Sequence, residues 1–137
     1  MRKMKHILNT LLLFIILSFV NNSYCQEDER WKMITTDRNR FIYLDSKTIE
    51  IKENENKEKF IQCWLKEIPT KKEIVNEREL KYVMKNSVFY CAERKIKFIE
   101  TYTYYRDNTS SLDTAAVFIN TIVPESLAEI LFNFVCK

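Results

Sequence analysis

The segment from Ile122 to Lys137 has the pattern of an amphipathic helix that begins at a proline and carries a cysteine next to its end. Pro124 suits the first helical turn because its φ is already set and no N–H is lost there. At about 100° per residue one face is apolar, and it comprises Leu127, Ile130, Leu131, Phe134 and Val135. Such a helix needs an apolar surface to cover. Cys136, at the border of that face, is either a buried thiol or half of a disulfide.

Residues 1–25 have the three-part pattern of a secretory signal. Basic residues near the start are followed by an apolar stretch over 7–20 and by small and polar residues over 21–24. This stretch is shorter than the roughly 20 apolar residues that a spanning helix needs. We therefore expect cleavage before Gln26, an exported domain over 26–137, and no transmembrane segment in the mature chain.

Cys25 offers an alternative, as the acylated first residue of a lipoprotein. Bulky Tyr24 argues against it because a small residue is normally needed just before the acylated cysteine. Either route leads to the periplasm or the cell surface, where disulfides persist.

Removal of the signal takes away Arg2, Lys3 and Lys5, so 22 − 3 = 19 basic residues face 19 acidic ones. A net charge near zero argues against nucleic acid as a partner, because such binding depends on a surplus of positive charge. His6, the only histidine, is also lost, and the chain has no glycine. Histidine-dependent triads, mixed Cys/His zinc sites and glycine-rich phosphate loops are therefore excluded. We expect no catalytic, cofactor or metal residues and a protein that is not an enzyme.

The residues between the signal and the terminal helix predict mainly β structure in one domain. Strand patterns cover 30–35, 41–44, 48–52, 59–68, 82–93 and 94–105, and the stretch 114–121 leads to the terminal helix. In the strand over 59–68, large apolar groups alternate onto both faces, which is typical of a central strand. The strand over 94–105 has Ile96, Phe98, Tyr102 and Tyr104 at even spacing. The charged stretch 69–81 is predicted to be an excursion loop with a helical turn, and 106–113 a polar loop.

Three cysteines remain after cleavage, so at most one intramolecular disulfide can form. A bond between Cys91 and Cys136 would connect a strand to the last turn of the helix. Closing that loop of about 45 residues is worth roughly 4 kcal/mol in the chain-entropy model. Cys63, in the central strand, is expected to be a buried free thiol.

Several segments in order resemble the surface-adhesin protein E-like domain of bacteria over nearly all of the mature chain. These are Trp31, the run 43–49, Trp64, the run 91–95, the tyrosine-rich run 102–105, and 123–126 leading to 135–137. The resemblance implies an α+β, mainly β fold, with a single antiparallel sheet of about six strands. It also implies that a Cys91–Cys136 disulfide holds the C-terminal helix on the concave face. Glu125 stands where many relatives have glycine, and Cys63 has no evident counterpart.

The resemblance implies a non-enzymatic binding module that binds host matrix or plasma proteins. The alternative is a periplasmic or envelope-associated structural protein, whose partner is another envelope component or a second copy in a homodimer. A charged and aromatic surface is the candidate binding site, formed by Lys85, Arg94, Lys95 and Lys97 beside Tyr90, Tyr102, Tyr104 and Tyr105. Strand lysines also protect sheet edges and tyrosines also pack in cores, so both interpretations stay open.

Overall fold

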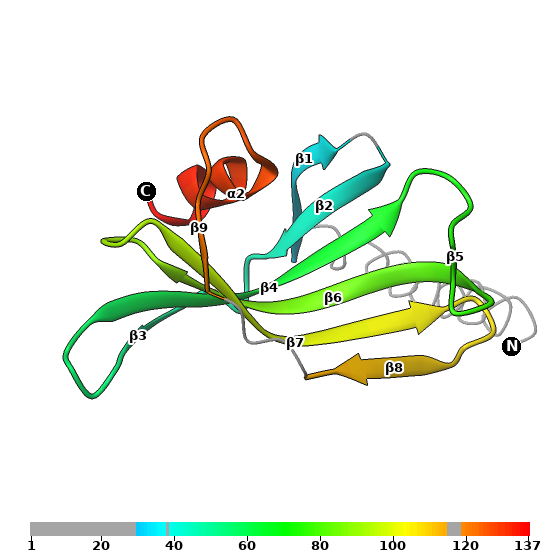
Figure 1. The fold of residues 1–137 in the computed structure, drawn as a ribbon, viewed down its shortest axis with the longest axis horizontal. Helices are drawn as coiled ribbons and strands as arrows, with labels where there is room; N and C mark the ends of the chain where they lie inside the picture. The colour runs from blue at the N-terminus through cyan, green and yellow to red at the C-terminus, as the bar shows by residue number, and fades with distance from the viewer. Residues whose placement is uncertain (1–29, 38, 115–118) are drawn as a thin grey trace, which may run out of the picture. The chain divides into compact units, whose positions relative to one another are not determined.

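The computed structural model describes residues 30–37, 39–114 and 119–137, and the predicted signal over 1–25 lies outside these ranges. The strands are β1 Trp31–Asp37, β2 Arg40–Asp45, β3 Glu50–Glu53, β4 Lys59–Pro69, β5 Ile74–Val75, β6 Arg78–Tyr90, β7 Lys95–Tyr105, β8 Ser110–Asp113 and β9 Ile119–Thr121. A helix, α2 Leu127–Val135, follows them. Figure 1 shows these elements with the same labels.

Six strands form a continuous antiparallel sheet in the order β1-β2-β4-β6-β7-β8. Three short strands extend it: β3 pairs with β4, β5 with β6, and β9 with β7. This confirms the predicted mainly β fold with one antiparallel sheet and a C-terminal helix. β4 is central as expected, because β2 and β3 pair along one side of it and β6 along the other.

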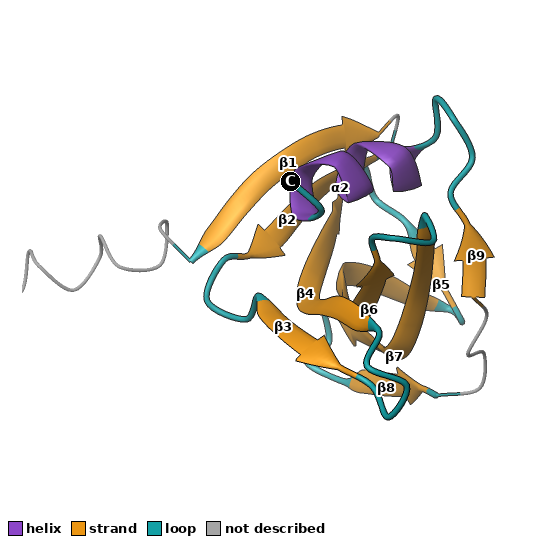
Figure 2. Cartoon of the chain, turned by 90° about the vertical axis from the view of Figure 1, so that its left-hand side faces the viewer, coloured by secondary structure: helices purple, strands orange, loops and turns teal. Residues whose placement is uncertain are grey.

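The core lies between α2 and one face of the curled sheet (Figures 1 and 2). Alternate side chains of the strands point to that face, which we call the concave face. The buried cluster comprises Ile42, Leu44, Cys63, Leu65, Phe89, Ile96, Ile122, Leu131, Phe132 and Val135. The structure therefore gives the terminal helix the apolar surface that its sequence requires.

A disulfide joins Cys91, just after β6, to Cys136, just after α2, with 5.6 Å between the Cα atoms. Cys63 is a free, buried thiol among the described cysteines. The pairing implied by the family resemblance and the expected state of Cys63 are both confirmed.

The helix begins at Leu127 and not at Pro124 as predicted. Ser126 is its N-cap, and its hydroxyl accepts a 3.3 Å hydrogen bond from the N–H of Glu129. Glu125 has φ 60°, which is left-handed, so the backbone cannot run helically from Pro124 into Ser126.

The buried side of α2 is also rotated relative to the prediction. Ile130 and Phe134 were expected on the covered face but are 47% and 38% exposed, whereas Phe132 is buried. The disulfide at Cys136 explains the difference, because Phe132 lies one turn before Cys136 on the same side of the helix. Linking Cys136 to the end of β6 turns that side toward the sheet.

Two predicted loops contain strands. The stretch predicted as an excursion with a helical turn instead forms a hairpin, in which β5 and β6 are joined by Asn76 and Glu77. Both linking residues have positive φ, 51° and 64°, as a two-residue hairpin turn of the primed type requires. Glycine usually marks such turns, and its absence hid this one. β8 lies in the predicted polar loop 106–113 and pairs with Thr101–Tyr104 of β7.

A bulge in β7 places Tyr102 and Tyr104 on the opposite face from Ile96 and Phe98. Their even spacing in the sequence had predicted one shared face. Ser87 pairs with Phe98, but the next residue, Asn86, pairs with Glu100, so Ile99 is an extra residue. Because one extra residue reverses the alternation, side chains after it change face. Phe98 packs against the core, whereas Tyr102 lies on the other side of the sheet, beside Trp64.

Candidate protein-binding surface

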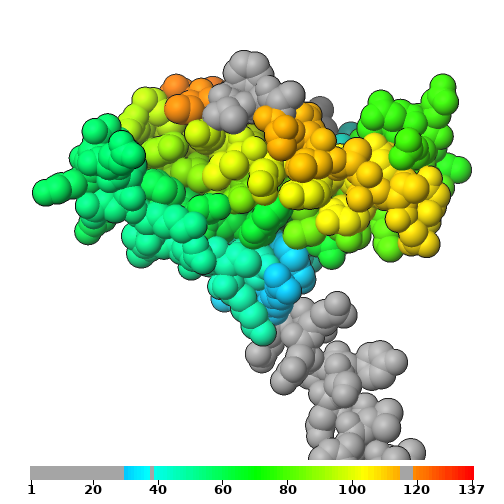
Figure 3. Space-filling view, turned by 90° about the horizontal axis from the view of Figure 1, so that it is seen from below, coloured from blue at the N-terminus to red at the C-terminus, as the bar shows by residue number. Residues whose placement is uncertain are grey.

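The second face of the sheet, which we call the convex face, is not covered by α2. Figure 3 views the molecule from this side, where the red of the helix does not appear and the greens and yellows of β4, β6 and β7 fill the centre. A sheet face packed on one side and open on the other normally alternates apolar with polar residues. Here one part of the open face is apolar and aromatic as well, and polar residues, Gln62, Asn86 and Glu100 among them, lie beside it on the same face.

The strand register builds a row of side chains across the convex face. Directly paired residues share a face, and the pairings run from β1 to β8 through Met33, Tyr43, Lys66, Met84, Tyr102 and Leu112. Spaced about 4.8 Å apart, six strands span roughly 24 Å. Met33 and Leu112, at the two ends, are 58% and 51% exposed.

Further apolar groups flank this row. We define the convex band as the row together with Trp31, Phe41, Trp64, Ile68, Tyr82 and Tyr104. Lys66 is the single charged residue in this set of twelve. Its aromatic members other than Phe41 are half-buried, so each still presents part of its ring to solvent. Monomers rarely leave contiguous apolar surface of this kind exposed unless it serves binding.

The rings of the convex band are held in place by one another. Tyr82 and Tyr104 stack with centroids 4.5 Å apart, and Trp64 lies 5.9 Å from Tyr102. The ammonium of Lys66 lies 5.2 Å from the ring centroid of Trp31 and 4.7 Å from that of Tyr82. Burial, and then the neighbouring Tyr104, raises the pKa of Tyr82, so its phenol keeps its proton. Such pre-positioned rings lose little side-chain entropy when a partner binds.

The structure separates the predicted binding residues. Tyr102 and Tyr104 are in the convex band, and Lys97 and Tyr90 lie on the same face farther along the sheet. Lys95 pairs with Glu93 in the β6–β7 turn region.

The remaining predicted residues lie elsewhere. Lys85 lies on the concave face, where it pairs with Glu67 and stands 5.3 Å from the ring of Phe98. Arg94 binds the helix, and Tyr105 is buried. The eight residues therefore do not form one surface.

Sequence reasoning missed much of the convex band. Trp64 and Lys66 could have been found, because the alternation in β4 places them on the same face. Tyr43 and Tyr82 could not, because only the long-range pairing of β2, β4 and β6 brings them beside Lys66.

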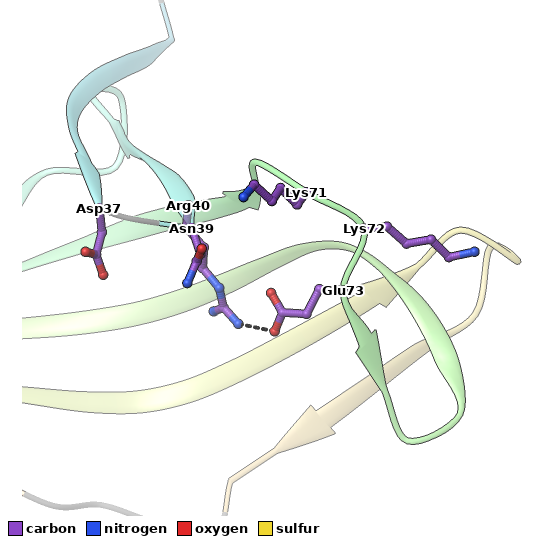
Figure 4. Close-up of a pocket in the computed structure, with 6 residues that line it drawn as sticks. All are labelled: Asp37, Asn39, Arg40, Lys71, Lys72 and Glu73. Carbon is purple, nitrogen blue, oxygen red and sulfur yellow. Dashed lines mark hydrogen bonds and ion pairs between the residues drawn. The ribbon is translucent and has the colours of Figure 1, made fainter.

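A polar hollow of about 420 Å³ lies between the β1–β2 turn and the segment after β4 (Figure 4). Its central cation, Arg40, is already bound by Glu67 at 2.7 Å and Glu73 at 2.6 Å. Burial alone would lower the pKa of Arg40, but its hydrogen bonds to Glu73 and Glu67 raise it. Because its cations and anions are mixed and Arg40 is satisfied, we assign no ligand to this hollow.

Neither a metal-binding cluster nor a membrane-spanning helix is found among the described residues. Among residues 30–37, 39–114 and 119–137, no group of three or more His, Cys, Asp or Glu side chains could hold a metal ion. In the same ranges, no helix is long and apolar enough to cross a membrane.

Burial, and then the charge of Asp45, raises the pKa of Cys63 to about 12, so this thiol is a poor nucleophile.

Comparison with known proteins identifies both a family and a fold. A sequence model of the family described as surface-adhesin protein E matches residues 31–137. Crystal form II of Haemophilus influenzae protein E superimposes with a TM-score of 0.61 at 14% identity, covering 78% of this chain and 87% of that one.

A selenomethionine form of the same Haemophilus protein gives a TM-score of 0.58 at 11% identity, covering 78% of this chain and 85% of that one. No curated protein sequence matches the chain significantly.

Proposed function

The chain belongs to the surface-adhesin protein E family, and from this premise we propose that it is an exported, non-enzymatic module that binds a protein partner through the convex band. The observation that carries the proposal is the row of side chains from Met33 to Leu112, which is apolar or aromatic at every position except Lys66. Aromatic residues and methionine are enriched, and charges depleted, in the cores of protein interfaces.

The two faces of the sheet support a division of roles. The concave face is filled by α2, and its charged residues Lys85 and Glu67 satisfy each other. The convex face carries aromatic rings that the core does not use. Tyrosine and tryptophan are also the residues most often found at the energetic centres of interfaces.

The proposed route to the partner is export by the signal over residues 1–25, which leaves a binding domain over 26–137 in the periplasm or at the cell surface. The intact mass of the exported protein tests this, and we expect a first residue of Gln26. A mature protein that instead begins at a diacylated or triacylated Cys25 would support the lipoprotein alternative.

The proposed partner is a host matrix or plasma protein, and an envelope component is the alternative. If the protein is exposed on the cell surface, protease treatment of intact cells should digest it. Survival of the protein would exclude the adhesin role and favour an envelope partner.

Binding is tested by surface plasmon resonance against purified matrix and plasma proteins and against envelope fractions in parallel. We expect the band variant Tyr104→Ala to weaken binding at least about tenfold, the range typical of residues that dominate an interface, and Leu112→Ser, at the end of the row, to weaken it less. Ile51→Ser is the matched control, because Ile51 is 75% exposed but lies in β3, outside the convex band. Equal losses in all three variants would contradict the proposal.

A further inference from the structure

Building on the proposed function, we propose that the convex band selects a partner segment that places one carboxylate between apolar side chains, with Lys66 as the counterion of that carboxylate. The partner is thus a protein segment in which an acidic residue is flanked by aromatic or aliphatic ones.

Among the described residues, Lys66 has no carboxylate of its own. Its contacts are the rings of Trp31 and Tyr82. The two cations of the concave face differ: Lys85 is paired with Glu67, and Arg40 with Glu67 and Glu73. The concave face therefore neutralises its charges internally, and the convex band does not.

The ammonium of Lys66 is held over the centre of the convex band. Lys66 lies in the middle of the cross-sheet row, between Tyr43 of β2 and Met84 of β6, and its side chain is half-buried. Cation–π attraction to two rings keeps the ammonium above the sheet surface and does not use its hydrogen-bonding capacity. The ammonium thus has donors available for a group arriving from outside.

The surroundings of Lys66 exclude the other partner classes. An entirely apolar partner would remove water from the ammonium without replacing its hydrogen bonds, which is unfavourable. A nucleic acid would need several cations along a track, and Lys66 is the single cation of the convex band. A single carboxylate among apolar groups satisfies both the charge and the surface around it, and it rejects neutral competitors.

The test uses two small probes that do not depend on an identified partner. They are the acetylated, amidated tripeptides Phe-Glu-Phe and Phe-Gln-Phe, which differ only in the carboxylate. Binding to isotope-labelled exported protein is followed by NMR through the Cε–Hε signal of Lys66 and the ring signals of Trp31 and Tyr82. We expect the Glu peptide to bind at least about fivefold more tightly, the ratio that one partly desolvated ion pair of about 1 kcal/mol supplies.

Two variants complete the design. Lys66→Met keeps the apolar stem and should abolish the preference for the Glu peptide. Lys97→Met removes a lysine that lies on the same face but outside the convex band, so the preference should remain. The dispersion of the NMR spectrum and retention of the Cys91–Cys136 disulfide confirm that each variant is folded.

Equal binding of the two peptides to the wild-type protein, or no shift at Lys66 with either, would overturn the assignment of Lys66. Loss of the preference in Lys97→Met but not in Lys66→Met would also overturn it. Failure of the proposed function would be recognised differently, as no protein bound in the panel or no effect of Tyr104→Ala, whatever the peptides show.

Discussion

Arg94 donates a 2.8 Å hydrogen bond to the carboxylate of Glu129 and so connects the β6–β7 turn to the first turn of α2. The same guanidinium lies 5.1 Å from the ring centroid of Phe132. Glu129 also accepts a 2.8 Å bond from the backbone N–H of Glu125. The start of the helix is therefore fixed by polar contacts, while the disulfide fixes its end.

The first prediction concerns pH. The N–H of Glu125, and after it Arg94, hold the pKa of Glu129 below its ordinary value of 4.5. A lowered pKa in the folded state gives stability that is present above pH 4.5 and is lost as pH falls through the folded pKa. Glu129→Gln should therefore be less stable than wild type at pH 7 and converge with it in acid, as measured by urea denaturation at several pH values. A difference that persists unchanged at low pH would contradict this.

The second prediction concerns the disulfide. The double variant Cys91→Ser/Cys136→Ser should lose roughly 2–4 kcal/mol of unfolding free energy, because a loop of 45 residues is no longer closed in the unfolded chain. Replacing both cysteines avoids exchange with Cys63. Wild-type protein in reducing agent serves as the control and should show a loss of similar size.

The third prediction concerns Cys63. Burial, followed by the charge of Asp45, raises the pKa of this thiol from 9.0 to about 12, so it should react with Ellman's reagent only when the protein unfolds. Since the raised pKa belongs to the folded state, its contribution to stability is complete below pH 9 and is lost as pH rises toward 12. Cys63→Ala should therefore lose less stability than wild type over that range. Rapid labelling under native conditions at pH 8 would show that the thiol is accessible.

The fourth prediction tests which side of α2 is buried. Leu131→Ala should cost about 2–4 kcal/mol, since the side chain is 5% exposed and leaves a cavity. Ile130→Ala, at the neighbouring exposed position, should cost less than about 1 kcal/mol. Thermal and urea denaturation of the two variants side by side provide the measurement. Equal losses of unfolding free energy in the two variants would contradict the observed burial and favour the helix face predicted from the sequence.

The fifth prediction follows from turns made without glycine. Glu77 has φ 64°, a conformation that is unfavourable for residues with a Cβ. Glu77→Gly should raise the unfolding free energy by up to about 1 kcal/mol. Lys32→Gly in β1 is the control and should lower it by about 0.5–1 kcal/mol, because glycine weakens a strand.

Features that depend on local periodicity were predictable from the sequence. The alternation in β4 predicted a central strand with Cys63 and Leu65 on one face, and both are buried; the pattern of the terminal segment predicted a helix. Each signal resides within a dozen consecutive residues, where side-chain period and secondary structure are directly linked.

Features that depend on long-range pairing were not predictable. The extra residue Ile99 reverses the face of Tyr102 and Tyr104, and no local pattern announces it. The ion pair of Lys85 with Glu67 also joins strands far apart in sequence, which is why Lys85 was placed on the binding surface. The convex band exists only once β1, β2, β4, β6, β7 and β8 are in register.

The position of α2 after every strand has a consequence for the order of synthesis. Ile42, Leu65 and Phe89 are made before the segment that covers them, and Cys91 before its partner Cys136. During translation and export the sheet residues therefore emerge with their apolar side uncovered. A chaperone that holds the emerging chain would protect it until the helix arrives, and a premature stop codon before Leu127 would leave that side permanently open to aggregation.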